Sequence, residues 1–287
     1  LKGIKLNIKK VEIVGLLGPN GAGKTTTLKI LTGLLNPDRG SIKIMGQQIG
    51  RGLPGWLKSK IGVVFEESNL YLRLNALDNL KLFAGINNVS RERVLELLSE
   101  YQLQDAAQKE VKTFSKGMKK RLMICRALLA EPEILILDEA TGGLDPISAE
   151  IIREKILALK KEGKTVILST HYLEEADRLC DKIAFINQGQ VIALDSPEVF
   201  KDSLQDKYLE LKFLADSELT EAEIRNYIEE FLDIEDDYSL ESNLIILRLN
   251  INQQLFDKAA AAASKFKFCA LDKIEADLQQ VFKNLNN

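Results

Sequence analysis

Cysteine is scarce in this sequence, and its three cysteines are scattered. Cys125, Cys180 and Cys269 lie far apart among 287 residues, without the close spacing that cysteine ligands of a metal show. An odd number of separated thiols is typical of a protein kept in a reducing compartment, where a free cysteine behaves as a small core residue. We therefore predict three core thiols and no cysteine-based metal site.

Long apolar runs and an excess of positive charge are also missing. No apolar run approaches the ~20 residues that a membrane-spanning helix needs. The net charge of -3 gives no overall positive field for a nucleic-acid backbone, so no nucleic-acid partner is expected. Residues 1–15 lack the core and cleavage site of a signal peptide, and we expect the natural N-terminus to precede Leu1. These absences predict a soluble protein whose membrane role would depend on a partner.

Short apolar runs alternate with helical segments up to about residue 200. Leucines have helical spacing between residues 75 and 130, and four runs predict buried strands: 11–17, 61–65, 134–137 and 165–169. Such alternation favours a mainly parallel sheet covered on both faces. Residues 41–49 predict exposed β structure.

The pattern changes after residue 200. Residues 208–213 alternate in polarity like a half-buried strand, and residues 253–264 have helical spacing. Thr220 and Glu223 have the spacing of a capping box at a helix start. We therefore predict one domain over residues 1–200 and a small α+β domain over residues 201–287.

A glycine-rich loop follows the first predicted strand and opens a helix. Gly18 to Thr25 reads Gly-Pro-Asn-Gly-Ala-Gly-Lys-Thr, which matches the Gly-x-x-x-x-Gly-Lys-Thr pattern of a phosphate-binding loop. Backbone N–H groups and the helix N-terminus favour a bound phosphate there, with Lys24 at the β- and γ-phosphates and Thr25 on Mg²⁺. A chance glycine turn is the alternative, which the flanking strand and helix disfavour. The predicted nucleotide contacts are Gly18, Pro19, Asn20, Gly21, Ala22, Gly23, Lys24, Thr25 and Thr26.

Two acidic residues end the apolar strand predicted at 134–137. Asp138 suits the Mg²⁺ shell, and Glu139 suits the polarisation of an attacking water. A parallel sheet brings carboxylates at a strand end beside the phosphate loop of a neighbouring strand. Two solvated acids are the alternative, which the phosphate loop disfavours. Together the two motifs predict only the broad class of nucleotide hydrolases, with Mg²⁺ as the metal ion.

Three further motifs narrow this class. Residues 114–118, Phe-Ser-Lys-Gly-Met, resemble the LSGGQ signature of ATP-binding cassette proteins, and Leu144-Asp145 resembles their D-loop. His171, the one histidine of the chain, follows a predicted strand where the family has its switch histidine. The resemblance covers about residues 1–200. It implies that Ser115, Gly117 and Asp145 also bind nucleotide, that Lys24, Glu139 and His171 are catalytic, and that Thr25, Asp138 and Glu66 contact Mg²⁺.

The resemblance also implies a fold and an assembly. The fold is α/β: a P-loop NTPase core with a mainly parallel sheet, an antiparallel β subdomain, a helical subdomain inserted at about residues 67–130, and the small C-terminal α+β domain. The function is ATP binding and hydrolysis that drive a separate transmembrane permease from the cytoplasmic face of the cell membrane. The partner is a second ATPase subunit in a head-to-tail dimer, expected as a homodimer with ATP. Residues 277–282 resemble a terminal helix of bacterial drug- and antibiotic-export cassettes, which favours export.

The chain departs from the family pattern at a few positions. Glu66 stands where the family has its Q-loop glutamine, and it adds a carboxylate near Mg²⁺ and the γ-phosphate. Lys116 and Met118 replace a glycine and the glutamine of the signature. None of these changes removes an essential charge, so we expect an active ATPase. The aromatic residue that stacks on adenine in the family would precede Leu1.

The sequence leaves two alternative functions, and it leaves two alternative roles for one surface segment. A cassette ATPase that acts on nucleic acid or the ribosome is the main alternative, although such relatives carry long coiled-coil insertions or a second cassette. A binding-only regulator is another, against which the intact Lys24, Asp138 and Glu139 argue. Residues 69–72 either dock a short helix of the permease or pack inside the helical subdomain.

Overall fold

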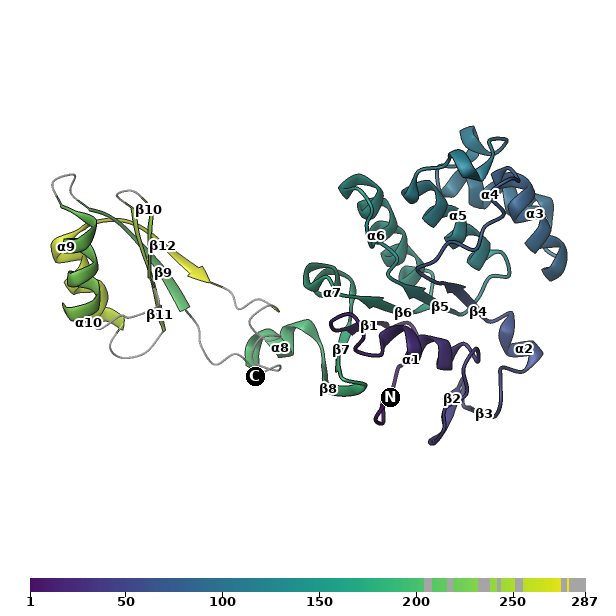
Figure 1. Ribbon diagram of the computed structural model, residues 1–287, viewed down its shortest axis with the longest axis horizontal. Helices are drawn as coiled ribbons and strands as arrows, with labels where there is room; N and C mark the ends of the chain where they lie inside the picture. The colour runs from purple at the N-terminus through teal and green to yellow at the C-terminus, as the bar shows by residue number, and fades with distance from the viewer. Residues whose placement is uncertain are drawn as a thin grey trace. The chain divides into compact units, whose positions relative to one another are not determined.

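The chain folds into two compact units, Leu1–Pro197 and Glu198–Asn287. The computed structural model in Figure 1 describes residues 1–203, 208–215, 219–231, 238–241, 244–250, 255–274 and 278. The motif noted at residues 277–282 lies outside these ranges except for Leu278, which is buried. Within the described ranges, no helix has both the length and the apolar character that crossing a bilayer requires.

A six-stranded sheet forms the centre of the first unit. Its strands are β1 (Ile13–Leu17), β4 (Ile61–Val64), β5 (Ile134–Asp138), β6 (Thr165–Thr170), β7 (Lys182–Asn187) and β8 (Gln190–Asp195). The order is β4-β5-β6-β1-β7-β8, with the first five strands parallel and β8 antiparallel to β7. Asp138 pairs with Ser169, and Leu17 pairs with Thr170. The carboxyl ends of β5, β6 and β1 therefore meet at one edge of the sheet.

Helices cover both faces of this sheet. In Figure 1, α1 (Lys24–Leu31) lies on one face, and α5 (Lys116–Leu128) and α6 (Pro146–Lys161) lie on the other. Leu16, Ile136 and Ile167 come from three adjacent strands and pack with Leu28 of α1 in one buried cluster. Burial of each such side chain contributes about 1.5–3 kcal/mol, so this cluster fixes α1 and the loop before it against the sheet. The predicted α/β fold with a mainly parallel sheet is confirmed.

The segment between β4 and β5 is mostly helical. Asn75 and Ser90 cap α3 (Ala76–Asn87) and α4 (Arg91–Glu100), because their side chains accept hydrogen bonds from the N–H groups of Asp78 and Arg93. The apolar stripes of these helices are buried against α5, as the helical spacing predicts. Two short 3₁₀ turns, Gln104–Ala106 and Val111–Thr113, lead into α5.

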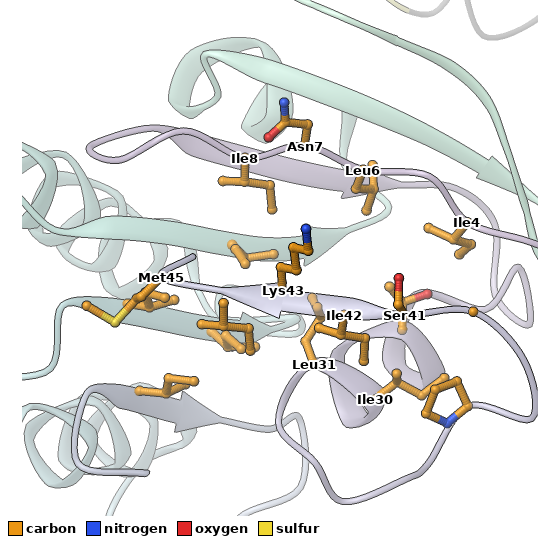
Figure 2. Close-up of a pocket in the computed structure, with 18 of the residues that line it drawn as sticks. Ile4, Leu6, Asn7, Ile8, Ile30, Leu31, Ser41, Ile42, Lys43 and Met45 are labelled. Carbon is orange, nitrogen blue, oxygen red and sulfur yellow. The ribbon is translucent and has the colours of Figure 1, made fainter. Parts of the chain in front are cut away.

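A small antiparallel hairpin lies beside α1. It consists of β2 (Ile42–Ile44) and β3 (Gln47–Ile49), and α2 (Gly55–Lys58) follows it. A cavity of about 1470 Å³ separates the hairpin, α1 and the N-terminal segment, and Figure 2 shows Ile4, Leu6 and Ile8 lining it. The hairpin supplies the exposed β structure that the sequence predicts at residues 41–49.

The second unit contains a four-stranded antiparallel sheet, and the helices between its strands lie on one face of it. The elements are α8 (Pro197–Ser203), β9 (Tyr208–Leu214), α9 (Glu221–Asn226), β10 (Tyr238–Glu241), β11 (Leu244–Asn250), α10 (Leu255–Lys265) and β12 (Lys267–Ile274). The strand order is β10-β11-β9-β12, a βαββαβ arrangement. Phe213 of β9 and Ile228 are fully buried in its core, and Thr220 forms the predicted capping box with Glu223.

The cysteines are not all core residues. Cys125 and Cys180 are buried, as predicted, but Cys269 is exposed, so the prediction for Cys269 is wrong. Cys269 lies at an irregularity in the edge strand β12, between the paired residues Phe268 and Ala270. A bulged residue leaves the regular alternation of a strand, and its side chain need not follow the buried face.

Candidate active site

The glycine-rich loop connects β1 to α1, and its conformation requires glycine at two positions. A Cβ on Gly18 would lie 2.1 Å from the carbonyl oxygen of Ile186, so no side chain fits there. Gly23 has a φ of 109° at the N-terminus of α1, in the left-handed region that glycine adopts without strain. The close approach and the left-handed turn are those a phosphate-binding loop needs.

The other predicted loop residues have different exposures. Gly18 and Ala22 are buried and fix the loop against the sheet, whereas Pro19, Asn20 and Gly21 are exposed at its tip. Thr26 is exposed in the first turn of α1 and lines the cavity beside the hairpin. Gly23 caps α1 without a side-chain hydrogen bond, so the first N–H groups of the helix are left for a ligand.

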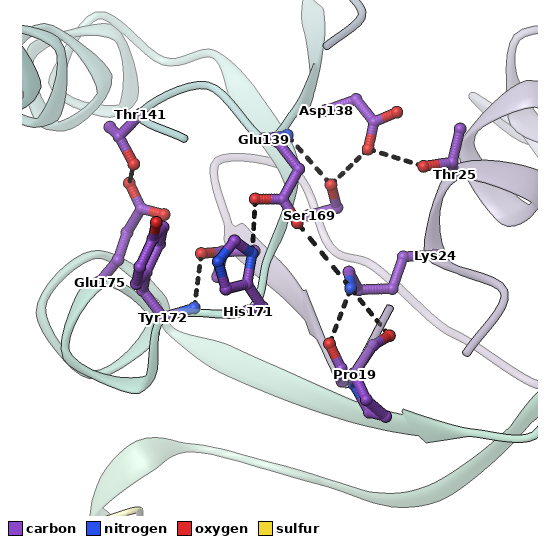
Figure 3. A network of polar contacts seen from close by, with 12 residues as sticks. Pro19, Lys24, Thr25, Asp138, Glu139, Thr141, Ser169, His171, Tyr172 and Glu175 are labelled. Carbon is purple, nitrogen blue, oxygen red and sulfur yellow. Dashed lines mark hydrogen bonds and ion pairs between the residues drawn. The ribbon is translucent and has the colours of Figure 1, made fainter. Parts of the chain in front are cut away.

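Lys24 is buried within this loop. Its Nζ donates to the carbonyl oxygens of Gly18 (2.7 Å) and Pro19 (3.1 Å) and lies 3.8 Å from Glu139 Oε1 (Figure 3). Burial lowers the pKa of Lys24, while the carboxylates of Glu139, Asp138 and Glu66 oppose that shift. The ammonium therefore lies between the loop and the acids that end β5.

Asp138 is the centre of a small oxygen cluster. Thr25 Oγ1 donates to Asp138 Oδ1 at 3.2 Å, and Ser169 Oγ donates to the same oxygen at 2.5 Å. The carboxylate and the threonine hydroxyl supply the hard oxygen donors that Mg²⁺ prefers, so the residues present fit this ion. Ser169 was not predicted from the sequence, although its position at the end of β6 is a signal that a parallel-sheet argument could have used.

Glu139 is held in a strained conformation. Its φ of 49° is uncommon for a residue other than glycine, and its N–H donates to both Ser169 Oγ (3.1 Å) and the Ser169 carbonyl (3.2 Å). Glu139 Oε2 lies 2.9 Å from His171 Nδ1. The sequence predicts both residues but not their contact, which orients the imidazole. Lys24, Glu139 and His171 thus lie in one chain of polar contacts (Figure 3).

Ser115, Gly117 and Asp145 lie at two helix N-termini. Ser115 caps α5 by accepting from the Met118 N–H, and Asp145 caps α6 by accepting from the Ser148 N–H, which lowers the pKa of Asp145. A Cβ on Gly117 would lie 2.4 Å from Ser148 Oγ, so α5 and α6 meet closely at this glycine. In the part of the chain that the structure describes, no hydrogen bond or ion pair joins Ser115 or Asp145 to the contacts around Lys24.

Two further charged residues, Glu66 and Lys120, interact electrostatically with the groups of this site. Glu66 is exposed in the loop after β4, and its charge acts on both Lys24 and Lys120. Lys120 of α5 is buried, and its Nζ donates to the Phe65 carbonyl at 3.4 Å. The sequence shows Lys120 only as one of three consecutive basic residues after the signature, which gives no sign of its burial.

Comparisons with known proteins decide the family. The family model described as ABC transporter matches residues 1–142. A fluoroquinolone export ATP-binding protein of Mycobacterium tuberculosis is 38% identical over 216 residues, which are 75% of this chain and 71% of that protein. The chain belongs to the ABC transporter family, as one of its ATP-binding cassettes.

Other relatives agree with this cassette assignment. The linearmycin resistance ATP-binding protein of Bacillus subtilis is 43% identical over 198 residues, covering 68% of this chain and 63% of that protein. A solved ATP-binding subunit of an ABC transporter has a TM-score of 0.64 and 34% identity, covering 71% of this chain and 86% of that chain. A solved dimeric cassette bound to ADP and phosphate has a TM-score of 0.62 and 31% identity, covering 68% of this chain and 90% of that chain.

The family fixes the class of the enzyme. The cassette is an ATP-binding and ATP-hydrolysing subunit, as the resemblance predicts. A transporter subunit is favoured over the alternative of a cassette that acts on nucleic acid or the ribosome, because the matched family is described as ABC transporter and the Mycobacterium tuberculosis relative is named as an export protein.

Proposed function

We propose that this cassette uses Mg-ATP to drive export through a separate membrane permease. Two relatives support export, since their names state fluoroquinolone export and Nod factor export, and the name of a third states lantibiotic transport. The observation that carries the proposal is the joint placement of Lys24, Asp138, Glu139 and His171 at one edge of the sheet. In this proposal the chain lies at the cytoplasmic face of the membrane and is held there by the permease.

Each residue of the edge has a defined role in this reaction. The loop N–H groups and Lys24 bind the β- and γ-phosphates, and Lys24 exchanges its loop carbonyls for phosphate oxygens. Thr25 and Asp138 would hold Mg²⁺, with Glu66 as a further oxygen donor, and the bound ion would offset phosphate charge. Glu139 orients the attacking water and takes its proton, and His171, oriented by Glu139, contacts the γ-phosphate.

The second half of the site comes from another copy of the chain. Ser115 and Asp145 form no hydrogen bond or ion pair with the Lys24 group within the described part of the chain, and Ser115 and Gly117 lie at the N-terminus of α5, which suits an anion. A head-to-tail homodimer brings each signature helix to the ATP on the partner's loop. The solved dimeric cassette bound to ADP and phosphate supports the formation of a dimer.

Residues 69–72 divide between docking and packing. Tyr71 is 52% exposed and Leu72 is 46% exposed, whereas Leu70 is buried. Asn69 is occupied by hydrogen bonds from Arg126. We therefore assign the permease contact to Tyr71 and Leu72, and Leu70 to the packing of the helical subdomain.

A complementation experiment tests the split site. Lys24→Ala removes the phosphate cation, and Ser115→Glu places a carboxylate against the partner's phosphate; each variant alone is expected to lose ATP turnover. A mixed dimer contains one fully intact site, so an equal mixture should recover up to about a quarter of wild-type turnover. A mixture as inactive as its components contradicts the head-to-tail arrangement. Wild-type protein without ATP turnover contradicts the proposed function itself.

A further inference from the structure

Glu175 is a buried acidic residue that takes no direct part in the proposed reaction. It lies in the first turn of α7 (Leu173–Leu179) and is 3% exposed. Its Oε1 accepts a hydrogen bond from Thr141 Oγ1 at 2.5 Å (Figure 3). The same oxygen lies 4.0 Å from Nε of Arg153 in α6. Burying a carboxylate is costly unless it is hydrogen-bonded and paired, so these two contacts are what allow Glu175 to lie inside the protein.

Thr141, the hydrogen-bond partner of Glu175, lies in the loop that follows the proposed proton acceptor. Glu139 lies two residues before Thr141, and the loop ends at Asp145, the cap of α6. Thr141 is itself 4% exposed, and a buried hydroxyl needs a hydrogen-bond partner. The contact with Glu175 therefore holds the middle of the loop of residues 139–145.

Helix α7, which carries Glu175, begins directly after the residue proposed to contact the γ-phosphate. Strand β6 ends at Thr170, His171 follows it, and Tyr172 is the cap of α7. The Tyr172 N–H donates to Thr170 Oγ1 at 3.0 Å, so the turn around His171 is short and closed by its own hydrogen bond. Glu175 lies four residues after His171. The position of His171 thus depends on where α7 begins.

Two contacts therefore join the loop of residues 139–145 to the segment that leads into α7. Glu139 Oε2 lies 2.9 Å from His171 Nδ1, and farther along both segments Thr141 meets Glu175. The His171 side chain is 41% exposed, whereas Thr141 and Glu175 are both buried. Polar contacts between buried groups are stronger and less screened than those open to water. The buried contact thus restricts how far Glu139 and His171 can move apart.

Ion pairs fix α7 on the side that faces α6. Arg178 Nη1 of α7 donates to Glu150 Oε2 of α6 at 2.7 Å, and Arg153 Nη1 lies 3.4 Å from the same oxygen. Arg153 is therefore shared between Glu150 and Glu175. These contacts hold α7 against α6, so Glu175 offers its carboxylate to the loop from a fixed helix.

We propose that Glu175 is a positioning residue for ATP hydrolysis, which holds Glu139 and His171 in their mutual arrangement through its hydrogen bond with Thr141. Glu175 acts through these residues and contacts neither the nucleotide nor the attacking water. The proposal rests on the proposed function, because it takes Glu139 as the proton acceptor and His171 as the contact to the γ-phosphate.

The variant Thr141→Val removes the hydrogen bond and keeps the shape of the side chain. Because small displacements of reacting groups slow a reaction strongly, kcat should fall about tenfold. The KM for Mg-ATP should stay within about twofold of wild type, since the loop of residues 18–25 follows β1 and belongs to neither of the joined segments. Thr141→Ser keeps the hydroxyl and should keep kcat within about twofold. A kcat for Thr141→Val within about twofold of wild type would overturn the proposal.

Thr165 provides a matched control. It is a buried threonine at the end of β6 opposite to His171, and its Oγ1 accepts from the Val11 N–H at 3.0 Å. Thr165→Val therefore also removes a hydroxyl hydrogen bond, but at the far edge of the same sheet. It should lower the thermal unfolding temperature and leave kcat unchanged. Equal losses of kcat in Thr165→Val and Thr141→Val would mean that general destabilisation explains both.

The single histidine of the sequence gives a second measurement, which needs no turnover. In protein with ¹³C-labelled histidine, one imidazole signal in the NMR spectrum reports His171 alone. Thr141→Val should shift or broaden this signal in the nucleotide-free protein, while Thr141→Ser and Thr165→Val should leave it in place. An unchanged signal in Thr141→Val would mean that the buried contact does not position His171.

A double variant separates positioning from stability. Thr141→Val leaves a buried carboxylate without its hydroxyl partner, and adding Glu175→Met removes that carboxylate while Arg153 keeps Glu150. Replacing both partners by apolar groups of similar shape is close to neutral for stability. The unfolding temperature should therefore recover, while kcat and the histidine signal stay as in Thr141→Val. Recovery of kcat together with stability would show that the contact is only structural.

The double variant also decides the question if Thr141→Val alone fails to fold, because it lacks the same hydrogen bond without leaving a polar group unpaired. Failure of the proposed function would be seen separately, as wild-type protein that does not hydrolyse ATP. The histidine signal would still report whether the contact between Thr141 and Glu175 positions His171.

Discussion

The phosphate-loop edge and the signature edge of the first unit are built differently. At the phosphate-loop edge, Lys24, Glu139 and His171 contact one another through side chains that the parallel sheet brings together. At the signature edge, Ser115 and Asp145 cap their own helices. One edge is thus joined by contacts between elements far apart in the sequence, while the other consists of two helix N-termini that are each capped by their own first residue. This difference agrees with the proposed head-to-tail dimer, in which a single chain would assemble only half of the ATP site.

The largest expected effect comes from the joined edge. Glu139→Gln removes the proton acceptor while keeping the side-chain size, so steady-state ATP hydrolysis should fall by about 10²–10⁴-fold. ATP binding, measured by calorimetry, should be retained. Glu133→Gln changes an exposed carboxylate that pairs with Lys60 and serves as the control. Hydrolysis by Glu139→Gln within about twofold of wild type would remove Glu139 from the reaction.

The signature edge should matter for assembly. With Mg-ATP, the Glu139→Gln protein is expected to form a dimer in light scattering, because in the proposed arrangement each nucleotide binds Lys24 of one copy and Ser115 of the other. Adding Ser115→Glu should return the protein to a monomer by placing negative charge at the phosphate. A monomer at saturating Mg-ATP and high concentration of Glu139→Gln protein would contradict the division of the site.

A smaller effect tests how the signature edge is held within the chain. Gly117→Ala places a Cβ 2.4 Å from Ser148 Oγ and 2.7 Å from Ser148 Cβ, so α5 and α6 must separate. We expect a loss of about 1–3 kcal/mol in the free energy of unfolding, measured by denaturant, and recovery when Ser148→Gly is added. Gly85→Ala in α3 meets no atom within 4 Å and is the control. Equal stability of Gly117→Ala and wild type would show that the two helices do not need this contact.

The smallest expected effect concerns Glu66, an exposed residue whose negative charge acts on Lys24 of the phosphate-loop edge. Without Mg²⁺, Glu66 repels the triphosphate, and with the ion bound that repulsion is offset. Glu66→Gln should therefore strengthen metal-free ATP binding more than Mg-ATP binding, by ~1 kcal/mol. Calorimetry of both proteins, with Mg²⁺ and with a chelator, gives this double difference. A value of zero would place Glu66 away from the phosphates.

Motifs that are continuous in the sequence predicted much of the fold. Contacts between residues that lie far apart in the sequence could not be predicted from such motifs. The loop of residues 18–25 was found because its pattern and flanking elements are continuous in sequence, and the α/β fold followed from alternating apolar runs. Ser169 escaped prediction because its contact with Asp138 depends on the pairing of β5 with β6. Lys120 escaped because three consecutive basic residues give no sign of which one the fold buries.

Strand β12 has a consequence for how copies of the chain behave at high concentration. It is the edge of the antiparallel sheet of the second unit, and an edge strand can pair with the same strand of another molecule and start aggregation. The irregularity at Cys269 interrupts the row of free N–H and carbonyl groups, and the exposed Lys267 adds charge beside it. The bulge that takes Cys269 out of the core therefore also hinders the growth of this sheet from one molecule to the next.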